Sequence, residues 1–169
     1  GCQVASRWLK ELAEEPEAPP TTDVTFVLVG NPLRAGTGFM VGRPEVGGAR
    51  SSKGTATPTD TGYPVFDIAR RYDGTADFPN NRRHWRAVTN ANAGKNTTHR
   101  HYENVSLNDA THTVWTVDTT TYILTAEPNL PMLPPLWRDS NPERYEELRE
   151  DIESAYERPE EDDPLLGGT

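Results

Sequence analysis

The chain has 169 residues, of which 34% are hydrophobic and 25% charged, and its net charge is −9. No run of about 18 apolar residues occurs, which excludes an integral membrane protein. No heptad repeat, collagen period or internal repeat is present either. The low apolar content favours a modest core over a large enclosed one.

Charge is distributed unevenly along the chain. Residues 34–101 contain eleven Lys and Arg against five Asp and Glu, whereas residues 138–163 contain twelve acidic and four basic residues. Such segments can attract each other within one chain or between copies. The arginines of the basic segment are scattered and accompanied by Asp67, Asp73 and Asp77, which argues against a nucleic-acid partner.

The N-terminal part is predicted to contain one helix and one strand. Apolar residues four apart predict an amphipathic helix over 3–15, and the prolines that follow predict an extended linker. Residues 23–30 are rich in β-branched side chains and predict a strand. Residues 42–62 are mostly Gly, Ser, Thr and Pro, which predicts a long loop or arm. The pattern over 63–72 fits a helix and a strand equally well.

The middle of the chain is predicted to be β-rich. Residues 85–89 and 99–107 are interpreted as strands separated by a polar loop over 90–98. Residues 111–126 predict a hairpin that turns near Asp118. Four prolines among apolar residues predict an extended segment over 127–137.

The C-terminal helix has the clearest signals. Ser140-Asn141-Pro142-Glu143 combines a capping residue, a proline in the first turn and an early acid, and Pro159 ends the pattern. The predicted fold is therefore mainly β with flanking helices: a small antiparallel β core, amphipathic helices at both termini and long Pro/Gly-rich arms. The predicted parts are an N-terminal helix with its linker (1–22), the β-rich core (23–126), a Pro-rich arm (127–139), and the C-terminal helix with an acidic tail (140–169).

The first residues suggest lipid attachment. Gly1 with Ser6 fits a myristoylation pattern, and the adjacent Cys2 is placed for palmitoylation. Two acyl chains anchor a protein stably where one does not. The segment GCQVAS resembles the start of picornavirus inner capsid proteins, which implies a myristoylated virion component. A processed bacterial lipoprotein with Cys2 as the lipidated residue, and a start left by cloning, are the alternatives.

The sequence offers little for catalysis or metal binding. His99 and His101 would share one face of a strand, but Cys2 is the only cysteine, so a metal site would need carboxylates such as Glu103. No Gly-x-Ser-x-Gly motif and no complete phosphate-binding loop occurs. We therefore predict no catalytic residues, no metal and no cofactor.

Low apolar content combined with long arms favours a non-enzymatic subunit of a large assembly, most concretely a virion component. Its partners would be other protein subunits and, through acylation, a membrane, so a virion or membrane location is favoured. The alternatives are a membrane-tethered adaptor or lipoprotein anchored through Cys2, and an enzyme of unrecognised type. The predicted partner-binding residues lie in the Pro-rich arm and the C-terminal helix: Leu133, Leu136, Trp137, Tyr145, Leu148 and Ile152.

Overall fold

The computed structural model of the chain describes residues 1–42, 55–108 and 111–159. Parts of the predicted 42–62 arm and of the acidic tail lie outside these ranges. The described helices and 3₁₀ turns are α1 (Cys2–Glu14), α2 (Trp85–Gly94), η1 (Thr98–Arg100), η2 (Tyr102–Asn104), α3 (Trp137–Ser140) and α4 (Pro142–Glu153). The strands are β1 (Phe26–Val29), β2 (Val65–Arg70), β3 (Thr113–Val117) and β4 (Thr120–Thr125).

The four described strands form one mixed sheet in the order β1-β2-β4-β3. β1 runs parallel to β2 and β2 runs parallel to β4, so Val65 pairs with Phe26 on one side and Thr120 on the other. The prediction of an antiparallel core is wrong except for the β3–β4 hairpin. The reason is that β1 and β2 are joined by a long connection and β2 and β4 by a crossover through α2, and crossovers return strands in the same direction.

The prediction of a mainly β chain is also wrong, because more described residues lie in helices than in strands. Residues 85–94, predicted as a strand and a polar loop, form α2, whose first turn is capped by the His84 side chain accepting from the Ala87 N–H. Residues 99–107, predicted as a strand, contain the turns η1 and η2 instead. The N-terminal helix, the strand after it, the hairpin and the C-terminal helix are confirmed. The ambiguous segment 63–72 contains β2.

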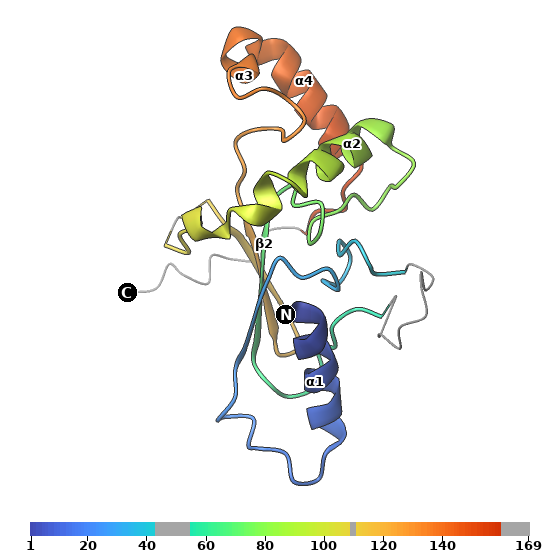
Figure 1. Cartoon of the computed structure of the whole chain (residues 1–169), viewed down its shortest axis with the longest axis vertical. Coiled ribbons are helices and arrows are strands. Elements are labelled where there is room, and N and C mark those ends of the chain that lie inside the picture. The colour runs from blue at the N-terminus through green and yellow to red at the C-terminus, as the bar shows by residue number, and fades with distance from the viewer. Residues whose placement is uncertain (43–54, 109–110, 160–169) are drawn as a thin grey trace.

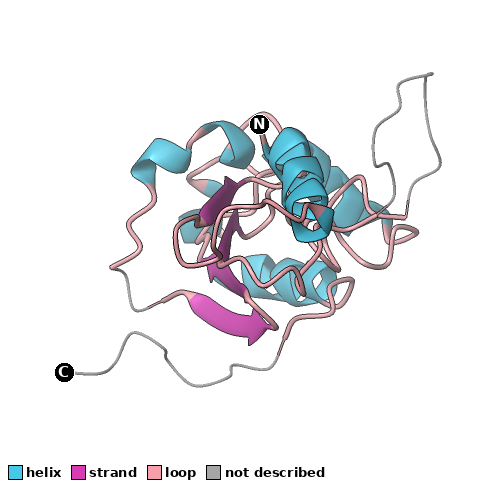
Figure 2. Ribbon diagram, turned by 90° about the horizontal axis from the view of Figure 1, so that it is seen from below, coloured by secondary structure: helices cyan, strands magenta, loops and turns pink. Residues whose placement is uncertain are grey.

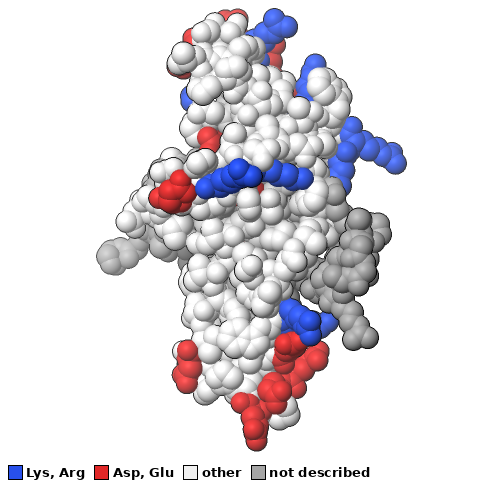
Figure 3. Space-filling view, viewed as in Figure 1, with Lys and Arg blue, Asp and Glu red and all other residues white. Residues whose placement is uncertain are grey.

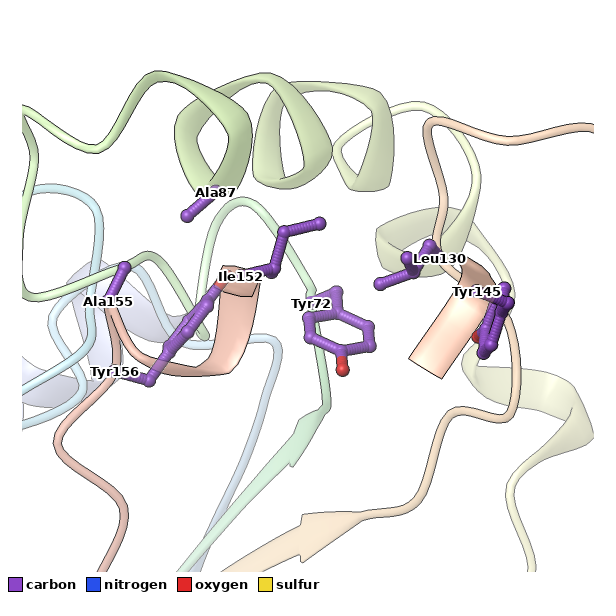
Figure 4. Packing of buried hydrophobic residues seen from close by; sticks show 7 residues of the cluster. All are labelled: Tyr72, Ala87, Leu130, Tyr145, Ile152, Ala155 and Tyr156. Atoms are coloured by element: carbon purple, nitrogen blue, oxygen red, sulfur yellow. The ribbon is translucent and has the colours of Figure 1, made fainter. Parts of the chain in front are cut away.

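Three hydrophobic clusters occur in the described residues, and the smallest consists of Ala69, Ala76 and Leu124. Figure 1 shows α1 alongside the strands and α2, α3 and α4 together at the other end of the molecule, and Figure 2 shows helices around the sheet from a second direction. The first cluster joins α1 to the sheet through Leu9, Leu12, Phe26, Leu28, Tyr63 and Val65. The second joins α2 and α4 to the end of β2 (Figure 4) and consists of Tyr72, Ala87, Leu130, Tyr145, Ile152, Ala155 and Tyr156.

Much of the charge is paired within the chain. On the face drawn in Figure 3, Lys and Arg side chains are scattered rather than gathered into one basic surface. The predicted attraction between the basic middle and the acidic C-terminal part is present as pairs of Arg71 with Glu153 and of Arg86 with Asp151. The pair of Arg158 with the buried Asp77 links the same two regions with the signs reversed, at 2.6 Å.

Candidate active site

The candidate site lies at the carboxyl ends of the parallel strands, where open α/β sheets commonly hold their functional residues. β1 ends at Val29 and is followed by Gly30, and β2 ends at Arg70 and is followed by a tight turn that carries Asp73. His99 reaches the same edge from η1, after the crossover helix α2. Residues far apart in sequence therefore meet because of the parallel topology.

The turn after β2 holds Asp73 rigidly. Tyr72 has a φ of 62°, a left-handed conformation that a bulky residue adopts only when its surroundings enforce it. The Tyr72 N–H donates to Asp77 Oδ2 at 2.8 Å, and the N–H groups of Thr75 and Ala76 donate to Asp73 Oδ1. The Asp73 side chain is 0% exposed. Its orientation is thus set by backbone donors of its own turn.

Close backbone packing joins this turn to α2. A Cβ atom on Gly94 would lie 2.0 Å from the Tyr72 carbonyl oxygen, and one on Gly74 would lie 1.8 Å from the Ala91 carbonyl oxygen. Only glycine fits at either position, since any side chain would separate the helix from the turn. The helix that leads to His99 is therefore packed directly on the turn that carries Asp73.

His99 and Asp73 form a hydrogen-bonded pair. His99 Nδ1 lies 2.9 Å from Asp73 Oδ2, and the His99 side chain is 35% exposed. The pKa of His99 is raised above its usual range, chiefly by the hydrogen bond to Asp73, because the carboxylate stabilises the imidazolium form. Within the described part of the chain, the other ring nitrogen has no hydrogen-bond partner. A partly exposed imidazole oriented by a buried carboxylate is the arrangement of a general base.

Gly30 lies close to the side chains of His99 and Tyr102. Its φ is +64°, and a Cβ atom there would lie 2.8 Å from His99 Cε1 and 3.3 Å from Tyr102 Cε2. The glycine lets the backbone after β1 approach both rings. The end of β1 thereby fixes the position of the imidazole.

The predicted lipidation residues lie at the start of α1. Cys2 Sγ donates to the Val29 carbonyl oxygen at 3.3 Å and packs against the α1 cluster. Burial raises the pKa of the Cys2 thiol, so this group is not an activated thiolate. Acylation of Gly1 or Cys2 stays a prediction that these observations do not test.

The predicted partner-binding residues are largely packed within the chain itself. Tyr145 and Ile152 are buried in the α2–α4 cluster, and Leu133, Trp137 and Leu148 pack against it with part of their surface exposed. Leu136 is 75% exposed. Intramolecular packing accounts for most of this apolar stripe, and the docking of a partner stays a prediction.

The histidines do not form the strand face that the sequence suggested. His101 points to the exposed Glu103, with Nδ1 and Oε1 2.9 Å apart, while His99 points to Asp73. No group of three or more potential ligands that could hold a metal occurs in the described ranges. In the same ranges, no helix combines the length and apolar character needed to cross a membrane.

Sequence reasoning missed both members of the pair. The sequence places Asp73 among the scattered arginines, and it favours His99 as a partner of His101 in a metal site or in an enzyme pocket with a carboxylate, so it does not pair His99 with Asp73. The usable signal is an acid in the turn three residues after a buried strand, followed later in the chain by a histidine.

Comparison with known proteins supplies the family context. The PE-PPE domain model matches residues 1–157. The chain is similar to Esterase PE16 of Mycobacterium tuberculosis, with 34% identity over 174 residues that cover 94% of this chain and 32% of the relative. It is also similar to two proteins named as uncharacterized PPE family members from the same species. PPE42 is 35% identical over 126 residues, covering 70% of this chain and 21% of the relative. PPE28 is 31% identical over 144 residues, covering 79% and 21%.

The chain spans about a third or less of the length of these relatives. No solved structure matches it. The predictions of a virion component and of a non-enzymatic subunit are contradicted by the family match and by the similarity to an esterase. Low apolar content does not require arms that lie on neighbours, because the described residues bury three hydrophobic clusters of their own.

Proposed function

The chain belongs to the PE-PPE domain family, and from this premise we propose that it carries the acid–base pair of an ester hydrolase. The observation that supports the proposal is the hydrogen bond between His99 Nδ1 and the buried Asp73 carboxylate. Similarity to a protein named as an esterase supports the reaction class.

His99 is the general base in this proposal. Its free ring nitrogen takes the proton from the attacking hydroxyl, of a serine side chain or of water, and later returns a proton to the leaving alcohol. Asp73 holds the tautomer in which His99 Nδ1 carries the proton, and it stabilises the imidazolium that forms. The buried position of Asp73 strengthens this interaction, because the pair is partly shielded from water.

The test is hydrolysis of p-nitrophenyl butyrate by the native polypeptide that carries these 169 residues. His99→Gln and Asp73→Asn are each expected to lower kcat/KM by about a hundredfold or more, since general acid–base catalysis contributes at least that much. His101→Gln is the matched control, because His101 is also a turn histidine paired with a carboxylate but lies on the surface. A His99→Gln protein that is folded and hydrolyses the ester at more than half the original rate refutes the proposal.

A second measurement identifies the attacking group. A fluorophosphonate probe labels a serine that His99 activates, and labelling is expected to be lost in His99→Gln. Hydrolysis that depends on His99 without any labelling assigns the attack to water.

A further inference from the structure

Asp73 Oδ2 accepts a second hydrogen bond that the acid–base pair does not require. The Tyr102 hydroxyl lies 2.6 Å from this oxygen, on which His99 Nδ1 also converges at 2.9 Å. Oδ1 is occupied by the N–H groups of Thr75 and Ala76. Among the described residues, the hydrogen bonds of this carboxylate are therefore made by His99, Tyr102 and its own turn.

The direction of the Tyr102 hydrogen bond is defined. The Arg70 N–H donates to the Tyr102 hydroxyl oxygen at 3.0 Å, so the hydroxyl proton is left for Asp73. Burial, followed by the charge of Asp73, raises the pKa of Tyr102 and keeps the hydroxyl protonated. Arg70, the last residue of β2, therefore orients the Tyr102 hydroxyl so that it donates to Asp73.

The Tyr102 ring is also packed against the imidazole. The two rings meet edge to face, with centroids 6.3 Å apart and an interplanar angle of 86°. Gly30 lies against His99 Cε1 and Tyr102 Cε2. The position of the hydroxyl is accordingly determined by the same contacts that hold His99.

We propose that Tyr102 is a positioning residue that acts through Asp73: by sharing Oδ2 with His99, its hydroxyl weakens the interaction between the carboxylate and the imidazolium. This inference rests on the proposed function. A donor that shares the acceptor oxygen stabilises the carboxylate by itself, so less of its charge is available to the imidazolium. Asp73 would keep its place without Tyr102, because its turn still holds Oδ1, but its interaction with His99 would become stronger.

Few other charges act on His99. Arg100 disfavours the charged imidazole, and Arg70 lies nearby with its guanidinium held by Glu127 and by the carbonyl oxygens of Thr98 and His101. Removing the Tyr102 hydroxyl takes away the acceptor of the Arg70 N–H but none of the contacts that hold the Arg70 guanidinium. A shift in His99 titration in such a variant therefore reports the lost hydrogen bond.

The experiment is Tyr102→Phe, which removes the hydroxyl and keeps the ring. The titration of His99 is followed by NMR of its Cε1 proton, assigned by its disappearance in His99→Gln. We expect the pKa of His99 to rise by about half a unit. The acidic limb of the kcat/KM profile for p-nitrophenyl butyrate is expected to move upward by the same amount. Tyr63→Phe is the control, because that hydroxyl is also bonded, to the Pro19 carbonyl oxygen at 2.6 Å, but touches neither His99 nor Asp73.

The outcomes separate this inference from the proposed function. An unchanged or lowered pKa of His99 in a folded Tyr102→Phe protein overturns the role of Tyr102, even if His99→Gln abolishes hydrolysis. Full hydrolysis by His99→Gln overturns the proposed function and the catalytic meaning of Tyr102 with it, whatever the NMR titration gives. A loss of thermal stability without any shift in the titration would reduce Tyr102 to a structural residue and also overturns the inference.

Discussion

Replacing Gly94 by alanine tests whether the close packing of α2 on the Asp73 turn builds the site. An alanine Cβ at this position would lie 2.0 Å from the Tyr72 carbonyl oxygen, whereas ordinary contact begins near 3.4 Å. The helix and the turn would have to separate by roughly 1.4 Å, the difference between these distances. Overpacking of this kind costs about 1–3 kcal/mol. In an open helix the same change would instead stabilise by about 1 kcal/mol, because alanine is the better helix former.

The direction of the change in unfolding free energy therefore tests the packing argument, because overpacking predicts a loss and helix propensity alone predicts a gain. We expect Gly94→Ala to lower the free energy of unfolding by about 2 kcal/mol in urea denaturation, and to lower kcat, since His99 follows α2 while Asp73 lies on the turn. Asn92→Ala is the matched control: this residue is an exposed member of the same helix, and its replacement should be neutral or slightly stabilising. A Gly94→Ala protein at least as stable as the original would refute the packing argument.

Three further predictions concern the surroundings of the pair. Arg158→Met should lower the free energy of unfolding by about 3 kcal/mol, because it leaves the buried Asp77 without its ion pair. Arg144→Met, at an exposed arginine with no ion pair in the described ranges, should cost little. Equal losses for the two variants in chemical denaturation would contradict this reasoning. Gly30→Ala should reduce both stability and kcat, because the new Cβ would contact His99 and the positive φ strains an alanine. Gly36→Ala, where φ is +79° and an added Cβ would meet nothing within 4 Å, should reduce stability alone. Equal kcat values for the two variants would disprove the contact with His99. Because the pKa of His99 is raised in the folded state, the native protein should be more stable than His99→Gln below pH 6.5, by less than about 1 kcal/mol. This difference should be lost as the pH rises through the folded-state pKa of His99. A difference in thermal unfolding that grows with pH would refute this linkage.

The sequence by itself determined the elements whose signals are local. The apolar period of α1, the β-branched run of β1, the hairpin of β3 and β4, and the capped start of α4 depend on neighbouring residues, and all four are confirmed. The attraction between the basic middle and the C-terminal helix also followed from composition alone.

Only the tertiary structure decided the direction of the strands and the site. Whether β1 and β2 run parallel depends on how a long connection crosses the sheet, which no local pattern encodes. The close approach of α2 to the Asp73 turn at Gly74 and Gly94 is a contact between distant segments, and the small and polar residues 89–94 do not reveal it. Asp73 and His99 are 26 residues apart and meet because the crossover returns the chain to the same sheet edge. A hydrogen bond between residues so far apart is a property of the topology, and therefore the sequence contained its two partners without showing that they form a pair.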